Sequence, residues 1–353
     1  MFPQDAGAGS YLTGWIQKKG WRLDLNDLLL EIKDLSVEFR IFDGVVKAIN
    51  HLNLSVPRGK TVGIVGETGA GKTTTALSIM GLIPKPPGVV TSGEILFDGE
   101  DLLQCSEKTL QKYRGNRIAM IFQNPMTSLN PLYTVGHLIS QVLMEHQNLT
   151  HAQAMDRTGE LLEMVGIPKA RMKNYPHEFS GGMKQRVCIA MGLACNPQLL
   201  IADEPTTALD VTIQAQILDL MQGLKQKYNT STIFITHALG IVAEMADYVA
   251  VMYAGEVLEQ GTIKEVFTAP SHPYTKGLFG CIPDIYAEEY HPLHVIKGAM
   301  PDPLNLPEGC KFCERCDYAM EICRHQQPQT QLLEGEHMVK CHLFCSGQPL
   351  TIA

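Results

Sequence analysis

The chain has 353 residues, of which 45% are hydrophobic and 19% charged, a composition typical of globular proteins with a sizeable core. Its formal net charge of -8 at pH 7 argues against binding to nucleic acid through bulk positive charge, so no nucleic-acid partner is expected. Apolar runs long enough to span a bilayer are absent from the sequence, and so is the pattern of a secretory signal. We therefore expect the protein inside the cell.

Residues 1–26 hold both tryptophans but have no regular pattern, and we interpret them as a leader outside the fold, with an added fusion segment as one interpretation. From residue 28, runs rich in β-branched residues alternate with turns. They lead into KTVGIVGETGAGKTTTALSIMGL, where a buried strand is followed by a Gly-rich loop and a helix. This order predicts the start of an α/β core.

Helical patterns dominate between about residues 101 and 180 and predict a helical subdomain. Strands return in PQLLIADEP and STIFITH, each followed by a helical segment, which is typical of a parallel sheet covered by helices. Residues 247–261 predict a hairpin. Near residue 283 the composition shifts to Pro, Cys and His, so we expect one domain over residues 27–283 and a small Cys-rich appendage over 284–353.

A phosphate-binding loop is indicated by GETGAGKT at residues 66–73, which matches G-x-x-x-x-G-K-[ST] between a predicted strand and a predicted helix. Glycines allow backbone N–H groups to surround phosphate oxygens, Lys72 adds a full positive charge, and the Thr73 hydroxyl can ligate Mg²⁺. A chance Gly-rich turn is the competing interpretation, which the flanking strand and helix disfavour. The expected nucleotide-binding residues here are Gly66, Glu67, Thr68, Gly69, Ala70, Gly71, Lys72, Thr73 and Thr74.

The apolar strand LLIADEP at residues 199–205 ends in two acids. Asp203 can hold Mg²⁺ through water, and Glu204 can polarise the water that attacks a γ-phosphate. Alone, such a pair is more often a solvated strand end. Next to a phosphate loop, it predicts ATP hydrolysis.

Residues 179–186, FSGGMKQR, resemble the signature sequence of ABC-type ATPases, and they precede LLIADEP and ALD (208–210) in that family's order. The resemblance implies a P-loop NTPase fold with an ABC ATPase core. It also implies that Ser180, Gly181 and Gly182 bind the γ-phosphate of a nucleotide held by an opposite subunit, and therefore a dimer. Physically, Ser180 and the following amides can open a helix whose end binds an anion. A Ser-Gly-Gly helix cap is the competing interpretation.

Two further residues match the family by order and spacing. Gln123 in IFQNPMTSLNP resembles the Q-loop glutamine, which senses Mg²⁺ and water and faces the membrane part of the transporter. His237 in FITHALG resembles the switch histidine, which contacts the γ-phosphate. Together with Lys72 and Glu204 they form the expected catalytic set.

The aromatic residue that stacks on adenine is expected to be Phe39, with Phe42 as rival. Three positions depart from the family pattern. Phe179 and Met183 replace the more usual Leu and Gln of the signature, and Ala238 stands where an Asp is common after the switch histidine. The last change removes a carboxylate close to His237.

Cysteines gather near the C-terminus, where six of the ten lie from Cys310 onward. In a reducing compartment such a group favours metal or cofactor ligands over disulfides. Cys310, Cys313 and Cys316 form C-x₂-C-x₂-C, which is ferredoxin-like. Zinc is the rival metal, and a group of buried free thiols is the third interpretation.

Three patterns narrow the resemblance to ATP-binding subunits of oligopeptide and dipeptide importers, with most similarity to the dipeptide type. These are QNPMTSLNP, APSHPYTKGL, and a tail like G-C-x-F-x-x-R-C-x-x-A-x-x-x-C followed by V-x-C-H. In that family the tail resembles a [4Fe–4S] site, whose ligands here would be Cys310, Cys316, Cys323 and Cys341, with Cys313 as an extra.

The same resemblance implies partners and a location. We expect a second ABC ATPase subunit, identical or paralogous, two transmembrane permease subunits and an extracytoplasmic peptide-binding protein. The chain would then be peripheral, on the cytoplasmic face of the membrane, and would couple ATP hydrolysis to peptide import.

Other functions are weighed against this one. A soluble ABC ATPase of DNA repair or translation would carry a long coiled-coil insertion or a second cassette, and the sequence has neither. An iron–sulfur module with an inactive ATP site is disfavoured by Glu204 and His237. Another solute, such as nickel, is left open by the sequence.

Overall fold

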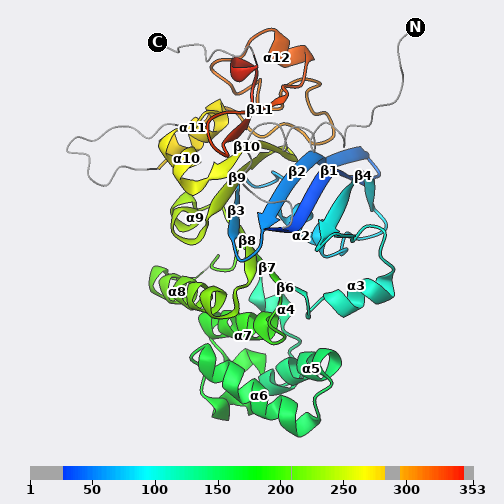
Figure 1. The fold of residues 1–353 in the computed structure, drawn as a ribbon, viewed down its shortest axis with the longest axis vertical. Coiled ribbons are helices and arrows are strands. Elements are labelled where there is room, and N and C mark those ends of the chain that lie inside the picture. Colours follow the sequence, from blue (N-terminus) through cyan, green and yellow to red (C-terminus); the bar gives the residue numbers. More distant parts are fainter. Residues whose placement is uncertain (1–26, 208, 283–294, 346–353) are drawn as a thin grey trace, which may run out of the picture.

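Two β-sheets make up the centre of the computed structural model, which describes residues 27–207, 209–282 and 295–345 (Figure 1). In these residues one sheet has eight strands and the other four. The strands are β1 (Leu28–Ile41), β2 (Gly44–Pro57), β3 (Thr61–Val65), β4 (Gly88–Phe97), β5 (Glu100–Asp101), β6 (Ile118–Ile121), β7 (Leu199–Asp203), β8 (Ser231–Ile235), β9 (Tyr248–Tyr253), β10 (Glu256–Thr262), β11 (Thr330–Leu332) and β12 (Met338–Lys340). The α-helices are α2 (Lys72–Ile79), α3 (Glu107–Tyr113), α4 (Pro125–Ser128), α5 (Val135–Gln147), α6 (His151–Met164), α7 (Gly181–Leu193), α8 (Val211–Tyr228), α9 (Leu239–Met245), α10 (Ile263–Thr268), α11 (Pro273–Gly280) and α12 (Ile322–His325).

The larger sheet has the strand order β11-β12-β10-β9-β3-β8-β7-β6. Strands β9, β3, β8, β7 and β6 are parallel, whereas β10, β12 and β11 add an antiparallel edge. Strands β3, β7 and β8 are buried along their whole length, as their apolar sequences predict. Because the carboxyl ends of parallel strands meet at one edge, the residues that follow β3, β6, β7 and β8 come together there.

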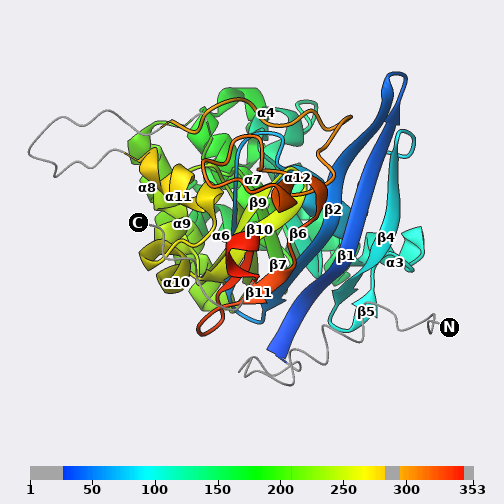
Figure 2. The ribbon, with the colours of Figure 1, turned by 90° about the horizontal axis from the view of Figure 1, so that it is seen from above.

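The smaller sheet, β2-β1-β4-β5, is antiparallel and runs beside the larger one (Figure 2). Strands β1 and β2 form a long hairpin that pairs from Ile41↔Gly44 to Leu28↔Pro57. One hydrophobic cluster joins the apolar faces of the two sheets and includes Leu30, Val37 and Ile95 together with Ile64. This packing holds the hairpin against the strand that precedes the phosphate loop.

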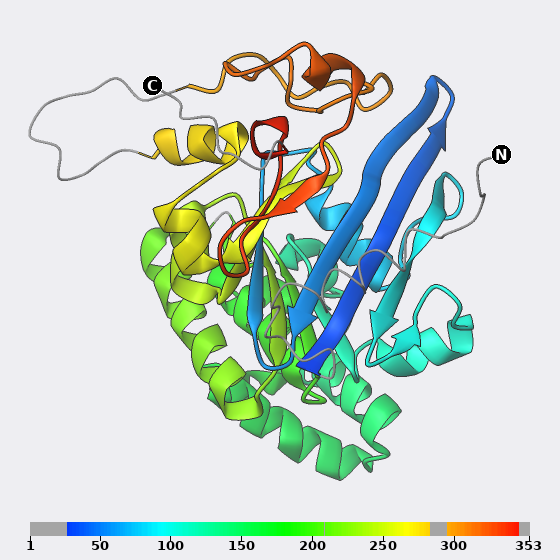
Figure 3. The ribbon, with the colours of Figure 1, turned by 45° about the horizontal axis from the view of Figure 1, so that its top comes forward.

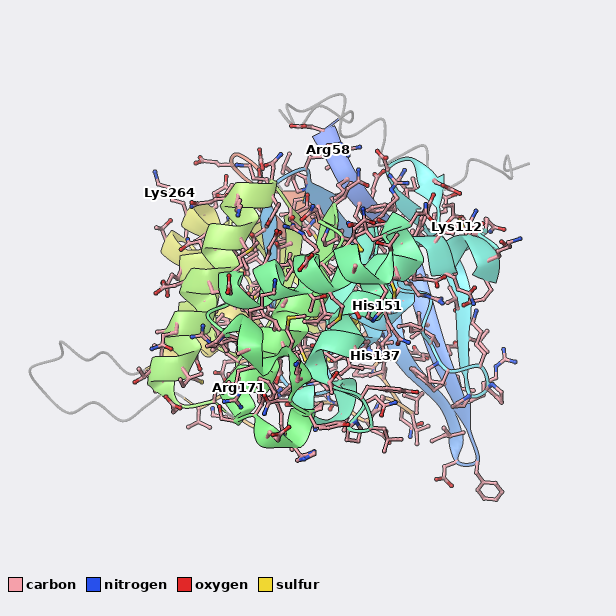
Figure 4. The ribbon with its side chains drawn as sticks, turned by 90° about the horizontal axis from the view of Figure 1, so that it is seen from below. Arg58, Lys112, His137, His151, Arg171 and Lys264 are labelled. Atoms are coloured by element: carbon pink, nitrogen blue, oxygen red, sulfur yellow. The ribbon has the colours of Figure 1, made fainter. Side chains whose placement is uncertain are left out.

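A helical part lies at one end of the molecule (Figure 1) and consists of α5, α6 and two 3-10 helices, η2 (Lys169–Lys173) and η3 (Pro176–Glu178). Figure 4 shows this part from below, with His137, His151 and Arg171 on it. Each of α5 and α6 starts at a threonine cap, Thr134 and Thr150. The predicted helical stretch from residue 101 also contains β6, an edge strand of the main sheet that the sequence pattern missed because it has only four residues.

The C-terminal residues 295–345 lie over β9 and β10 in all of the ribbon views (Figure 3). Strand β12 pairs with β10 at Glu259↔Val339, so this segment continues the main sheet. A distinct appendage is therefore not confirmed, and the division into domains at residue 283 stays a prediction. The leader at residues 1–26 lies outside the described residues.

In the described residues, none of the helices has the length and apolarity that crossing a bilayer requires.

Candidate active site

The phosphate loop, residues 66–71, follows β3 and leads into α2, as predicted. Gly66 has φ 151°, and a Cβ there would lie 2.1 Å from the Met252 carbonyl oxygen. Gly71, the N-cap of α2, has φ 99°, and a Cβ there would meet the Ala48 carbonyl oxygen at 2.8 Å. A side chain fits neither position. At Gly69 a Cβ would meet nothing within 4 Å, so this part of the loop is open, as a phosphate site requires.

The Lys72 side chain is buried at the start of α2 and closes the loop from inside. Its Nζ donates to the carbonyl oxygens of Gly66 at 2.7 Å and Glu67 at 2.9 Å. Burial lowers the pKa of Lys72, whereas the nearby charges of Glu204, Asp203 and Glu67 raise it. The ammonium group therefore lies near three carboxylates, and it can turn from the loop carbonyl oxygens to an anionic ligand.

Asp203, at the end of β7, is 2% exposed. Burial raises the pKa of its carboxyl, and a hydrogen bond from Thr73 opposes that shift. Among the described residues its Oδ1 is a buried atom without a hydrogen-bond partner. Such an oxygen requires a ligand, and a carboxylate beside a hydroxyl suits Mg²⁺, which prefers oxygen donors. The residues therefore fit the predicted magnesium site.

Glu204 is held by three side chains from different parts of the chain. Its Oε2 accepts hydrogen bonds from Gln123 Nε2 at 2.8 Å and Thr207 Oγ1 at 2.9 Å, and its Oε1 lies 3.4 Å from His237 Nδ1. Its backbone has φ 47°, a left-handed conformation that is uncommon for glutamate. Strained residues of this kind cluster at functional sites. The structure thus brings the predicted Gln123, Glu204 and His237 together.

The charge of Glu204 follows from these partners. Burial alone would raise its pKa, but hydrogen bonds from Thr207, His237 and Gln123 outweigh burial, so the pKa lies below the ordinary value. The carboxylate is therefore ionised at neutral pH, as a group that polarises water needs to be.

The predicted signature residues open helix α7. Ser180 is its N-cap, and the Ser180 hydroxyl accepts a hydrogen bond from the Met183 backbone N–H at 3.4 Å. Within the described parts of the chain, no hydrogen bond joins residues 180–182 to the phosphate loop.

The predicted adenine-stacking residue is not tested by the geometry. Phe39 lies in β1, opposite Val46 and Gly88, and packs partly buried against the core. Phe42 is fully exposed at the hairpin turn.

Two residues that contact the site were missed by sequence reasoning. Thr207 donates to Glu204 from three residues further along the chain, and its place in DEPTT is a local signal. The Tyr274 hydroxyl accepts a hydrogen bond from the Glu67 backbone N–H at 3.0 Å across 207 positions, which has no local signal.

The predicted iron–sulfur ligands Cys310, Cys316, Cys323 and Cys341 form no metal site in the structure. Among residues 27–207, 209–282 and 295–345, no group of three or more His, Cys, Asp or Glu side chains is arranged to hold a metal ion. The cysteines of this region are instead mostly buried as thiols, and burial raises the pKa of Cys310 and of Cys341 to about 12. The iron–sulfur assignment thus has no support from the structure.

The fold and the residues gathered at the ends of β3 and β7 are those of an ABC-type ATPase. A model of the ABC transporter family matches residues 49–207, and a model of the oligopeptide/dipeptide transporter C-terminal region matches residues 258–323. The second match starts inside the predicted ATPase domain.

Full-length relatives define the family. The chain is 52% identical over 323 residues to the oligopeptide transport ATP-binding protein OppD of Bacillus subtilis (strain 168), covering 91% of this chain and 90% of the relative. It is 47% identical over 319 residues to the dipeptide transport ATP-binding protein DppD of the same organism, covering 89% and 94%. The chain belongs to the family of ATP-binding subunits of oligopeptide and dipeptide ABC importers.

A solved structure agrees with the fold. The dimeric structure of the ATP-binding cassette MJ0796 in a post-hydrolysis state, bound to ADP and Pi, is 26% identical with a TM-score of 0.60. The match covers 66% of this chain and 98% of that one.

Proposed function

We propose that this ATPase hydrolyses ATP to power the import of dipeptides or oligopeptides. The observation that carries the proposal is the position of Glu204, ionised and held by Gln123, Thr207 and His237 beside the buried Asp203. Its relatives are named as oligopeptide and dipeptide transport proteins. These names support peptides over another solute.

Each side chain of the nucleotide site is proposed to have a separate role. The loop N–H groups and Lys72 bind the phosphates, and Thr73 and Asp203 would hold Mg²⁺, which supplies positive charge to the phosphate oxygens. Glu204 polarises the attacking water, and the surrounding Gln123 and His237 fix its carboxylate. Phe39 is proposed to stack on adenine, with Phe42 as the alternative.

A second ATPase subunit completes the site. Because Ser180, Gly181 and Gly182 form no hydrogen bond with the phosphate loop of the same chain in the described residues, we assign them to the nucleotide of a partner subunit. The relative MJ0796 is described as dimeric with ADP and Pi, which supports this arrangement. Closure on ATP and release after hydrolysis would then move the attached permeases.

The permease subunits are proposed to dock near the Q-loop. Large apolar side chains lie exposed within ten residues of Gln123 in the sequence, namely Phe122, Met126, Leu132 and Tyr133. Exposure of several large apolar side chains in one segment is typical of a protein interface. It supports two permease subunits as partners and a peripheral position on the cytoplasmic face of the membrane, with an extracytoplasmic peptide-binding protein delivering the solute.

The [4Fe–4S] site of Cys310, Cys316, Cys323 and Cys341, with zinc as rival, stays a prediction that rests on spacing and family resemblance. No step of the proposed function passes through it. Iron, sulfide and zinc analysis of protein purified without oxygen decides between a metal and free thiols.

The proposal is tested with the assembled importer, purified from membranes with this chain as bait and placed in lipid vesicles. We expect ATP hydrolysis that a peptide and the binding protein stimulate severalfold, and accumulation of labelled dipeptide or oligopeptide. Hydrolysis stimulated by a metal ion instead, with no peptide uptake, would contradict the proposal.

A further inference from the structure

Arg315, in the cysteine-rich region, reaches into the phosphate loop. Its Nη1 donates to Glu67 Oε1 at 2.9 Å and Oε2 at 3.2 Å, and its Nε donates to the Lys297 carbonyl oxygen at 2.9 Å. The Tyr253 hydroxyl lies 3.3 Å from the same Nη1. The arginine side chain is 7% exposed and the Glu67 side chain 30%, so this ion pair is partly shielded from water and is stronger than a fully exposed surface pair.

A second contact holds the same loop residue. Tyr274 accepts a hydrogen bond from the Glu67 backbone N–H and packs edge-on against Tyr253, with ring centroids 4.7 Å apart. The Phe312 ring lies 5.3 Å from each of these two tyrosine rings. The backbone of Glu67 is therefore held by this aromatic cluster, and its carboxylate by Arg315, whose guanidinium lies 5.7 Å from the Tyr253 ring centroid and 5.9 Å from that of Phe312.

The ion pair matters because Glu67 is an acid in a loop that binds anions. A carboxylate there repels phosphate groups and competes with them for the ammonium group of Lys72. The charge of Glu67 does reach that lysine, since it is one of the three carboxylates that raise the Lys72 pKa against the lowering effect of burial. Arg315 offsets this charge and draws the carboxylate toward the cysteine-rich region.

We infer that Arg315 is a positioning residue for nucleotide binding, which acts by neutralising and orienting Glu67. The inference rests on the proposed ATP-binding role of the loop and deepens it. The cysteine-rich region is thus a part of the ATP site, and removal of Arg315 weakens binding of MgATP through the charge of Glu67.

Steady-state ATP hydrolysis by the importer complex, with MgATP as the varied ligand, tests this inference. We expect Arg315→Ala to raise KM about tenfold, equivalent to about 1.4 kcal/mol of binding free energy, while kcat changes less than twofold. In a Glu67→Gln background, Arg315→Ala should change KM less than twofold, because no charge is left to offset. Arg324→Ala, the loss of an exposed arginine from the same region, is the matched control and should leave KM unchanged.

The possible failures are distinguishable. If the wild-type complex does not hydrolyse ATP, the proposed function fails. If it does and Arg315→Ala leaves KM within twofold, or raises it equally in the Glu67→Gln background, the inference alone is wrong. Should Arg315→Ala not fold, Arg315→Gln decides, because glutamine removes the positive charge but keeps part of the side chain: a rise in KM of about threefold that Glu67→Gln removes supports the inference, and an unchanged KM overturns it.

Discussion

The phosphate loop and the cysteine-rich region are both short segments in which the spacing of particular residues suggests ligand binding. The structure shows a different arrangement of those residues in each. In the loop, each glycine stands where a Cβ would collide or where the chain is open, and Lys72 closes it. In the cysteine-rich region, the thiols pack as hydrophobic groups beside Phe312. The difference teaches that a spacing which dictates backbone geometry is tested by the fold itself, whereas a spacing that only counts ligands stays a prediction until the metal content is measured.

The largest expected effect tests the loop side of this comparison. Glu204→Gln keeps the shape of the side chain but removes the charge that polarises water, so kcat for ATP should fall about 10³-fold. Because hydrogen bonds keep the Glu204 pKa low, this group adds no pH dependence to the wild-type kcat above about pH 6. Phosphate release gives the rates, and equilibrium binding of MgATP, which should persist, is the control. Full activity in the variant would remove the catalytic assignment.

The next prediction concerns the reactivity of the thiols and tests the cysteine-rich region. The chain has ten cysteines, of which Cys281 and Cys345 are exposed in the structure. A disulfide reagent at pH 8 should modify these two thiols rapidly, the half-buried thiols of Cys105 and Cys316 more slowly, and the six buried ones about 100-fold more slowly, because reaction there requires local opening. After denaturation all ten should react. Bound iron and sulfide, with fewer than ten reactive thiols until they are removed, would instead confirm the iron–sulfur prediction and contradict the arrangement of thiols seen here.

The sequence predicted those parts of the site that depend on neighbours along the chain. The strand–loop–helix around Lys72, the strand ending at Asp203 and the helix opened by Ser180 are all local patterns. The contacts of Arg315 and Tyr274 with Glu67 span 248 and 207 positions, and no local pattern contains them. Tertiary packing alone decides such contacts.

The fold shows the same limit. The hairpin at residues 247–261 was predicted because its two strands are adjacent, and β9 and β10 confirm it. The pairing of β12 with the edge strand β10 was not predicted. Strand β12 has only three residues, one of them buried, which is too short for an alternating pattern to be recognised in the sequence. For the same reason the predicted appendage looked separate from the core.

A smaller effect separates backbone geometry from side-chain chemistry in the loop. Gly66→Ala should lower the free energy of unfolding by about 2–4 kcal/mol, because its Cβ would lie 2.1 Å from the Met252 carbonyl oxygen and its φ is positive. Gly99→Ala is the matched control, since Gly99 has φ 82° but open space around its Cβ. We expect about 1 kcal/mol there. Chemical denaturation of both variants measures the difference, and equal losses would show that the close approach at Gly66 costs nothing.

The smallest effect tests whether Asp203 is kept for its ligand at the expense of stability. Burial holds the pKa of this carboxyl above its ordinary value of 3.8, so the ionised form is disfavoured by folding. Asp203→Asn should therefore raise the unfolding midpoint of the nucleotide-free protein by about 2 °C, equivalent to about 1 kcal/mol. The stabilisation that MgATP adds to the wild type should be lost.

The sign of the pH dependence distinguishes this cause from a general effect of the amide. The penalty is fully present above the raised pKa and shrinks as the pH falls through it, because Asp203 then becomes neutral in the folded state while it is still ionised in the unfolded chain; it is gone below the ordinary value of 3.8. The gain from Asp203→Asn should accordingly be largest near neutral pH and shrink in acid, as thermal unfolding at several pH values will show. Asp219→Asn, an exposed aspartate of α8, should shift the midpoint little at any pH. A gain from Asp203→Asn that does not depend on pH would mean that the charge of Asp203 is not what destabilises the nucleotide-free site.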